Sequence, residues 1–426
     1  MPRAVRGLAA VRPATHPLSE RHQPLMNLRR SAAALAAATV LGMAAVPAAS
    51  ADTPLPPGLY GTGDPTYDGV WRQSYALLAL DTAGVRPADS AVTWLTGQQC
   101  ADGGFPSYRA DPAKACDAKT EDTNATGIAV QALTALGGKD AVVKKATDWL
   151  TSVRNKDGGW SYNPGGASDP DSTAVVIGAL AAVKQDVKAS QDSLKAFQFG
   201  CDAKAADRGA FGYPMNGKLT VNAKATADAV RGARGAGFVV TAPTANTAAK
   251  APDCASPDAF KTLDAAGSAS AGAAYLTAQL TAGGAHLTAV TPGADKPTPD
   301  YGTTADAVVA LAAGGNLDTA KTSYDWLAKN SAVWSKGNPA ALSQLVLAAH
   351  ATGNDPRSAG GADLVQQLTN LGPKPAAAAS ASPSPSDKTE KKDGKSSSAT
   401  WWIVGVFFVA SIGVGFLVSG RKKKQG

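Results

Sequence analysis

Apolar and polar residues along the chain define two kinds of helical segment. The first kind is rich in alanine and apolar on most sides, and it covers residues 71–80, 123–133, 171–180, 224–233, 302–311 and 339–348. The second kind carries more charge, and its apolar residues recur at helical spacing, as at Val142, Ala146, Trp149 and Val153. It covers residues 90–99, 142–153, 190–199, 271–280, 322–331 and 362–371. We therefore expect the first kind to lie inside and the second kind outside.

The two kinds of helix alternate and form a repeat. Aligning the starts of the inner helices makes six positions equivalent, namely Gln73, Thr126, Thr173, Thr226, Thr304 and Ala341. Successive positions are 53, 47, 53, 78 and 37 residues apart. Spacings of this size are typical of helix-pair repeats with loops of variable length. Six such pairs can close as a ring in which each pair buries the next. The sequence thus predicts an all-α fold, an (α/α)6 toroid, over residues 52–372.

The turns between the two kinds of helix carry a second repeated pattern. Gln99 is followed by Asp102-Gly103-Gly104-Phe105, and Arg154 by Asp157-Gly158-Gly159-Trp160, with a weaker version from Gln279 to Gly284. This pattern resembles the QW motif of the terpenoid cyclase and protein prenyltransferase-like superfamily, which includes squalene–hopene cyclase. The resemblance covers roughly residues 60–370. It implies the (α/α)6 toroid, in which the glutamine amide bonds to a neighbouring helix end and the aromatic ring stacks beneath it.

Both ends of the chain carry targeting signals. Met26 is the better start, because Arg29-Arg30, an apolar run and Ala49-Ser50-Ala51 follow it as in a secretory signal peptide. Residues 1–51 are thus an upstream segment and a signal peptide. Residues 373–400 read as a disordered linker of Pro, Ala, Ser and Lys, 401–420 as a transmembrane helix and 421–426 as a basic cytoplasmic tail. We expect a single-pass cell-membrane protein whose N-terminal domain is extracellular.

The net charge of the chain indicates which partners to expect, and its cysteine content indicates whether it forms disulfides. The formal net charge of +7 comes from the ends, since residues 1–51 contribute +5 and residues 373–426 contribute +6, which leaves −4 for residues 52–372. A nucleic-acid partner is therefore not expected. The four cysteines predict two disulfides in an exported domain. Of the three possible pairings we favour Cys100–Cys116 and Cys201–Cys254, each of which closes a loop between helices.

Metal and cofactor chemistry is not indicated. The chain has no CxxC spacing, and His286 and His350 are isolated, so neither a cysteine zinc site nor the Asp, Cys and His zinc set of protein prenyltransferases is formed. We expect no metal and no cofactor.

Residues 169–172 are the strongest candidate for chemistry. Asp169-Pro170-Asp171-Ser172 resembles the D-x-D-D motif of class II terpene cyclases, with Asp171 in the place of the catalytic acid and Asp169 beside it. The last aspartate of the motif is replaced by Ser172, and the aromatic residues that would stabilise carbocations are few. Helix N-capping explains an aspartate here without catalysis.

We expect the ligand site where the N-termini of the inner helices converge, because free N–H groups there suit polar or anionic groups. The candidate ligand-binding residues are Glu121, Asp122, Asn124, Trp160, Tyr162, Asp169, Asp171 and Tyr301. The leading prediction is a membrane-anchored, non-catalytic binding module for a small molecule or a cell-envelope ligand. The alternatives are a terpene cyclase or prenyltransferase-like enzyme acting on an isoprenoid or lipid, with Asp171 and Asp169 as catalytic residues, and a structural surface spacer.

Overall fold

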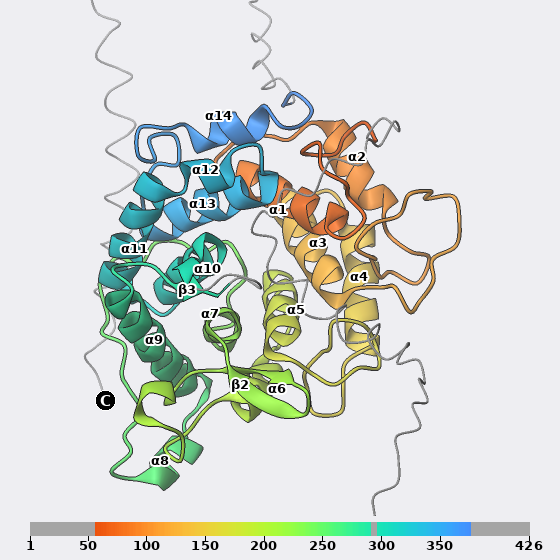
Figure 1. Cartoon of the computed structure of the whole chain (residues 1–426). Coiled ribbons are helices and arrows are strands. Elements are labelled where there is room, and N and C mark those ends of the chain that lie inside the picture. The colour runs from red at the N-terminus through yellow and green to blue at the C-terminus, as the bar shows by residue number, and fades with distance from the viewer. Residues whose placement is uncertain (1–55, 291–295, 376–426) are drawn as a thin grey trace, which may run out of the picture. The chain divides into compact units, whose positions relative to one another are not determined.

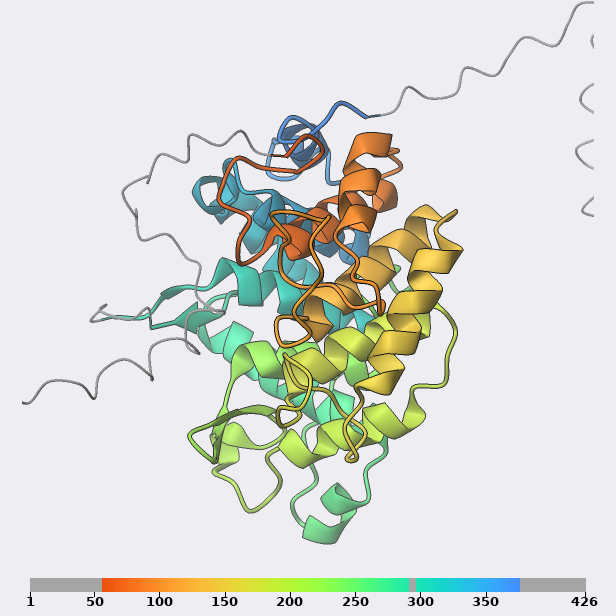
Figure 2. The ribbon, with the colours of Figure 1, turned by 90° about the vertical axis from the view of Figure 1, so that its right-hand side faces the viewer.

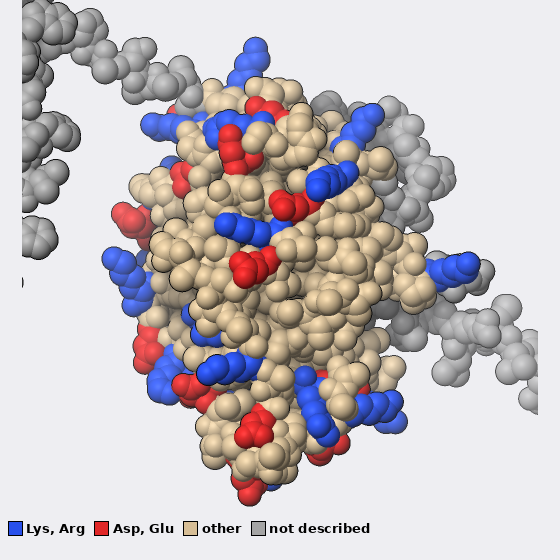
Figure 3. Space-filling view, turned by 90° about the vertical axis from the view of Figure 1, so that its left-hand side faces the viewer, with Lys and Arg blue, Asp and Glu red and all other residues tan. Residues whose placement is uncertain are grey.

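Helices dominate the part of the chain that the computed structural model describes, residues 56–290 and 296–375 (Figure 1). The predicted signal peptide, the predicted membrane span, the predicted basic tail and all but the first residues of the predicted linker lie outside this part. Among the described helices, none combines the length and the apolar character that crossing a membrane requires. On the face shown in Figure 3, basic and acidic side chains are interspersed.

Apolar helices form the inner layer. They are α1 (Gly69–Thr82), α3 (Thr123–Leu136), α5 (Pro170–Ala182), α7 (Ala223–Ala233), α10 (Tyr301–Ala313) and α13 (Pro339–Thr352). Each contacts the next in this order, and α13 contacts α1, so the six inner helices of the described chain close into a ring. These helices are buried on nearly all sides, as α5 shows from Ser172 to Leu180. This burial explains why their sequences lack a polar face.

More polar helices pack around this ring. They are α2 (Asp89–Gly97), α4 (Asp140–Ser152), α6 (Lys188–Ser193) with the 3-10 turn Leu194–Phe197, α9 (Ala265–Ala282), α11 (Leu317–Asn330) and α14 (Leu364–Thr369). In this order they pack against α1, α3, α5, α7, α10 and α13. The two sets of helices expected from the repeat are therefore both present, with the apolar set inside.

Two short antiparallel hairpins interrupt the helices. Strand β1 (Gly212–Met215) pairs with β2 (Lys218–Val221), and β3 (Thr288–Ala289) pairs with β4 (Thr298–Pro299). The first hairpin turns at Asn216-Gly217, where both residues have positive φ, as tight hairpin turns prefer. Each hairpin leads into an inner helix, and β3–β4 projects at the left of Figure 2. The all-α prediction omitted these strands. The short helices α8 (Pro257–Lys261) and α12 (Ala332–Ser335) and the 3-10 turn Ala205–Asp207 complete the described elements.

Most inner helices begin with a side-chain cap. Asp122, Asp169, Asn222, Asp300 and Asn338 each accept a hydrogen bond from a backbone N–H of the first turn. Such caps satisfy donors that have no partner inside the helix, and each contributes about 1 kcal/mol. Because all inner helices start on one side of the ring, the capped ends define one mouth, which we call the N-terminal mouth.

The aligned threonines explain how each turn is attached. The hydroxyl of Thr126 accepts a hydrogen bond from the backbone N–H of Phe105 at 2.9 Å, and Thr173 does the same for Trp160 at 3.0 Å. Gln73 plays this part in α1, where its Oε1 accepts from the N–H of Tyr60 at 2.9 Å. The positions that the sequence makes equivalent therefore share a structural role. Position 341 departs from this rule, because the cap at Asn338 places Leu342 in register with the threonines.

The Gly-Gly-aromatic turns connect neighbouring helix pairs through hydrogen bonds and buried rings. Gln99 Nε2 donates to the carbonyl oxygen of Val142 in α4 at 2.9 Å, and the ring of Phe105 is fully buried. A Cβ on Gly103 would collide with the carbonyl of Lys145, and its φ of +115° also favours glycine. The glutamine role that the resemblance implies is therefore seen at Gln99.

A third turn of this kind follows α6. Gln198 Nε2 donates to the carbonyls of Gly209, at 3.0 Å, and of Ser268, at 2.8 Å, and the N–H of Phe211 bonds to Thr226. An insertion between Gln198 and Gly209 hides this motif in the sequence. One of the two disulfides of the described chain, Cys201–Cys254, closes from within that insertion, and the other joins Cys100 to Cys116. The favoured cysteine pairing is thus confirmed.

Candidate active site

A cluster of charged and polar side chains connects three of the inner helices. Lys224 and Asp228 come from α7, Asp306 from α10 and Gln344 from α13. Lys224 Nζ pairs with Asp228 and lies 3.4 Å from Asp306 Oδ2, and Gln344 Nε2 donates to Asp306 Oδ1 at 3.1 Å. Arg231, one turn further along α7, pairs with Asp228 Oδ1 at 2.7 Å. Both partners of this last pair are 1% exposed, so two charges are buried together.

Opposite charges decide the protonation of Asp228. Burial alone would raise the pKa of this carboxyl, but the ammonium of Lys224 and the guanidinium of Arg231 outweigh it and lower the pKa. The pKa of Lys224 is raised, because Asp228 and Asp306 offset the effect of its burial. Burial raises the pKa of Asp306, although Lys224 partly opposes it. The cluster thus holds a firm ion network around Asp228.

Asp171 lies beside this network and is held differently. It is in the first turn of α5, and burial together with the negative charge of Asp228 raises its pKa well above the ordinary value. Lys224 counteracts this only in part. Among the described residues, no group forms a hydrogen bond with Asp171 Oδ1, which is buried. These conditions favour the neutral acid form of Asp171.

The capping role belongs to Asp169 instead. Asp169 Oδ1 accepts from the N–H of Ser172 at 2.8 Å, and its Oδ2 accepts from the Ser172 hydroxyl at 2.8 Å. Ser172 therefore occupies the place of the last D-x-D-D aspartate as a partner of Asp169. The prediction that Asp171 serves as a helix cap is wrong, because Asp169 already fills that position and Asp171 comes two residues later.

Aromatic residues pack together beside this cluster. Phe238, in the segment after α7, lies edge-on to Tyr75 at 4.9 Å and to Trp71 at 5.7 Å between ring centroids. The Arg231 guanidinium carbon lies 3.9 Å from the centroid of the Phe238 ring. Two cavities of about 40 and 120 Å³ in the described chain lie among α11–α14 and their loops, and none of these aromatic or charged residues lines them.

Asp122 and Asn124, two of the predicted ligand-binding residues, lie at the start of α3. Asp122 Oδ1 accepts from the N–H of Asn124 at 2.7 Å and of Ala125 at 3.0 Å, so it is a helix cap. Asn124 occupies the same position relative to its cap as Asp171 does in α5, two residues later, and its buried Oδ1 lacks a partner among the described residues. The side chain of Asp122 is thus occupied as a helix cap, whereas the side-chain oxygen of Asn124 is available to a ligand.

Two predicted aromatic residues line the N-terminal mouth. The hydroxyl of Tyr162 lies 3.2 Å from that of Ser107, which donates to Asp122, and burial raises the pKa of Tyr162. Tyr301 begins α10 and stacks on Trp334 at 5.6 Å between centroids. Both residues could contact a ligand that enters at this mouth.

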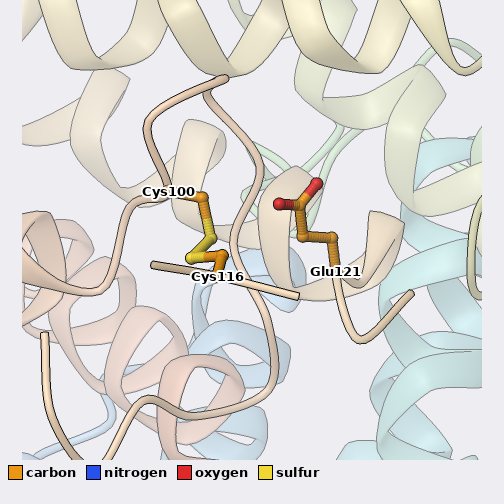
Figure 4. Close-up of side chains that lie close together, drawn as sticks. All are labelled: Cys100, Cys116 and Glu121. Carbon is orange, nitrogen blue, oxygen red and sulfur yellow. A yellow bond between two sulfur atoms is a disulfide. The ribbon is translucent and has the colours of Figure 1, made fainter. Parts of the chain in front are cut away.

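Glu121 and Trp160 lie instead among the turns that join the repeats. The indole N–H of Trp160 donates to the carbonyl of Leu150 at 2.7 Å, and the residue is fully buried. Glu121 is 2% exposed, and burial with the nearby Asp102 raises its pKa to about 7. Its carboxylate lies near Cys100 and Cys116, whose sulfurs are joined and so offer no thiolate to a metal (Figure 4).

Several residues of the site were not predicted: Tyr75, Lys224, Asp228, Arg231, Phe238, Asp306 and Gln344. Part of the signal was present in the repeat. Asp228 and Asp306 each follow the aligned threonine, Thr226 or Thr304, by two residues, so the alignment put them at one level of the ring. The position of Phe238 had no such signal, because it lies outside the repeated helices.

Comparisons with known proteins give distant similarities. No family model matches the chain. A curated protein, drimenyl diphosphate synthase of Streptantibioticus cattleyicolor, is 57% identical over 37 residues, which are 9% of this chain and 7% of that protein. The chain thus matches only a small fraction of the length of this relative.

Solved structures similar to this chain include cyclase and prenyltransferase folds. A protein from Actinoplanes has a TM-score of 0.44 at 14% identity and covers 70% of this chain and 93% of its own. Ent-copalyl diphosphate synthase from Streptomyces platensis has a TM-score of 0.43 at 14% identity, with 67% and 50% covered. Candida albicans protein geranylgeranyltransferase-I complexed with GGPP has a TM-score of 0.30 at 16% identity, with 46% and 62% covered. The likeness is distant in sequence and in structure.

Proposed function

We propose that this protein is a terpene cyclase-like enzyme in which Asp171 protonates a carbon–carbon double bond of an isoprenoid. The single observation that carries the proposal is the state of Asp171: its pKa is raised and its buried Oδ1 has no hydrogen-bond partner among the described residues. A carboxylic acid that remains protonated near neutral pH can act as a general acid. This reverses the preference for a non-catalytic module that the sequence favoured.

In the proposed reaction, Asp171 supplies the proton and Lys224 stabilises the charge that Asp171 acquires. Asp171 adds its proton to one alkene carbon and leaves a carbocation on the other. A second double bond of the same substrate attacks this cation and closes a ring, and loss of a proton to water completes an isomerisation. The carboxylate left on Asp171 is stabilised by the ammonium of Lys224. Solvent at the N-terminal mouth then returns a proton to Asp171.

Two further observations support an enzyme of this type. Residues 169–172 keep the first two aspartates of the D-x-D-D pattern, and Ser172 keeps a hydrogen bond to Asp169 in place of the third. The 37-residue match to a drimenyl diphosphate synthase also favours isoprenoid chemistry.

We further propose that the domain is exported and anchored to the membrane by residues 401–420. An isoprenoid held in that membrane is then the substrate within reach.

A non-catalytic binding module is the second candidate. It is favoured by the aromatic contacts of Phe238 with Trp71 and Tyr75, which fill space inside the ring of helices. In that case the ligand would bind at the N-terminal mouth, with Asn124, Tyr162 and Tyr301 as its contacts. The spacer alternative requires no ligand at all.

The test is to incubate the purified chain with farnesyl and geranylgeranyl diphosphate and with the corresponding alcohols, and to search for cyclised products. We expect Asp171→Asn to abolish product formation while the protein remains folded. Asp300→Asn is the matched control, because it neutralises a helix-capping aspartate at the same mouth and should leave turnover unchanged. Equal turnover by Asp171→Asn and the wild-type chain would refute the role of Asp171, and tight binding without product would favour the binding module.

A further inference from the structure

A buried carboxyl group lies against one of the two disulfides of the described chain. The sulfurs of Cys100 and Cys116 and a carboxylate oxygen of Glu121 lie within 4.8 Å of one another, and the two sulfurs are bonded. Figure 4 shows the Glu121 carboxylate beside this bond. The reaction proposed at Asp171 makes no use of this carboxyl group.

The second disulfide has different surroundings. Among the described residues, Cys201 and Cys254 form no comparable cluster with acidic or histidine side chains. Cys201 Sγ instead lies 3.8 Å from the backbone carbonyl oxygen of Asp253. The second disulfide therefore serves as an internal control for any effect of Glu121 on the first.

The two sulfurs of the first disulfide differ in their access to solvent. Cys116 is partly exposed and lies in a loop, residues 110–120, whose other residues are all exposed. Cys100 is 3% exposed, and its N–H donates to the carbonyl of Gly104 at 2.8 Å within the Gly-Gly turn. A thiolate that opens a disulfide attacks one sulfur and displaces the other. A thiolate from solvent therefore reaches Cys116, and Cys100 is the sulfur that leaves.

The leaving sulfur is buried, and this slows the exchange unless a proton is at hand. Burial in apolar surroundings raises the pKa of a thiol, and a thiolate of high pKa is a poor leaving group. A neighbouring acid removes this obstacle by protonating the sulfur as the bond breaks. Glu121 is the acidic side chain that lies beside both sulfurs.

The charges around Glu121 keep part of it protonated at neutral pH. Burial and the negative charge of Asp102 raise its pKa to about 7, and Asp117 adds to this effect. From α4, a hydrogen bond with Trp149 opposes the rise, and Lys145 donates to a backbone carbonyl at 3.1 Å. Glu121 can therefore give up a proton and recover it near neutral pH.

We propose that Cys100–Cys116 is an exchangeable disulfide, in which a thiolate attacks Cys116 and Glu121 protonates the Cys100 sulfur as the bond opens. The attacking sulfur forms a mixed disulfide with Cys116, and the electron pair of the broken bond passes to Cys100. A second thiolate attacks the mixed disulfide and releases Cys116, which takes a proton from solvent. Two thiols are thus oxidised to a disulfide, the protein disulfide is reduced to two thiols, and solvent returns the proton to Glu121.

The pH dependence of reduction tests this proposal. Both disulfides of the full chain are reduced with dithiothreitol between about pH 5.5 and 8.5, and the freed cysteines are alkylated and quantified by mass spectrometry. Rate constants are expressed per dithiothreitol thiolate, which removes the titration of the reagent. We expect the constant for Cys100–Cys116 to fall as the pH rises through about 7, because Glu121 loses its proton. The constant for Cys201–Cys254 should not change.

Three variants separate the role of Glu121 from a general effect on the fold. Glu121→Gln should lower the constant for Cys100–Cys116 by at least about tenfold at pH 6 and make it independent of pH. Asp102→Asn should move the fall to lower pH, because it removes a charge that raises the pKa of Glu121. Asp111→Asn is the matched control, since it neutralises an exposed carboxylate of the same loop and should leave the profile unchanged.

Three results would overturn the proposal. The first is a constant for Cys100–Cys116 that does not vary with pH in the wild-type chain. The second is an equal effect of Glu121→Gln and Asp111→Asn. The third is a mixed disulfide with glutathione that forms on Cys100 rather than on Cys116. These measurements use no isoprenoid, so their outcome is independent of whether the chain proves to be a cyclase.

Discussion

Replacing Asp228 by asparagine tests whether the ion network at the ring centre is structural as well as chemical. Asparagine keeps the shape of the side chain and an acceptor oxygen for Arg231, but it removes the negative charge. The side chains of Arg231 and Asp228 are each 1% exposed, and Arg231 Nη2 lies 2.7 Å from Asp228 Oδ1. The substitution therefore leaves a buried guanidinium without its carboxylate.

The expected cost follows from the burial of this pair. Removing one partner of a buried ion pair destabilises a protein by about 3–5 kcal/mol, because the remaining charge cannot return to water. We expect a loss near the lower end, about 3 kcal/mol, since the amide still accepts a hydrogen bond. Asp258→Asn is the control: Asp258 pairs with Lys261 at the same sequence spacing and 3.2 Å, but the two side chains are 91% and 75% exposed. Its loss should be below about 1 kcal/mol.

Equilibrium urea unfolding followed by tryptophan fluorescence measures both losses. The slope of the transition should remain the same, so the difference appears as a lower midpoint. If Asp228→Asn and Asp258→Asn lower the midpoint equally, the buried pair contributes no more than a surface pair and this reasoning is refuted. The substitution should also lower the pKa of Asp171, since the charge of Asp228 is one cause of its elevation.

Further predictions concern the turns and the disulfides. Thr173→Val leaves the N–H of Trp160 without an acceptor and should cost about 1–3 kcal/mol in urea unfolding, whereas an unchanged midpoint would show that the turn finds another partner. Because the folded-state pKa of Glu121, about 7, lies above its unfolded value, stability should rise as the pH falls through 7 toward 4.5. Glu121→Gln should remove that rise, and an identical pH profile would contradict the assignment. Replacing Cys201 and Cys254 together by serine should cost about 4 kcal/mol by loop entropy, and the loss of Cys100–Cys116 about 3 kcal/mol, because the first loop spans 53 residues and the second 16. The reverse order of thermal midpoints would contradict the loop argument.

The helices were predictable because their signal is periodic and repeated. The aligned threonine at the start of four inner helices has the same structural role in each, as Thr126 and Thr173 show, so the alignment carried geometric information. The cysteine pairing followed from which loops lie between helices. The hairpins were harder to foresee, because each spans only a few residues and their strands carry no long alternating pattern.

The site was only partly predictable for a different reason. Asp171 was identified from a local motif, but its protonation depends on Asp228 and Lys224, which are distant in sequence and meet it only through the closed ring. A capping residue and an acid look alike in sequence, and only the hydrogen bonds separate Asp169 from Asp171. Phe238 lies in the segment after α7, outside the repeated helices, and packs against Trp71 and Tyr75 of α1.

Infrared difference spectroscopy measures the protonation state of Asp171 most directly. Spectra of the wild-type chain and of Asp171→Asn are recorded across the pH range and subtracted, so that only the carboxyl group of this residue contributes a difference band. We predict the band of a protonated carboxylic acid at neutral pH, converting to carboxylate only at higher pH. A carboxylate band already at neutral pH, with protonation near pH 4, would contradict the claim that the ring holds Asp171 as an acid.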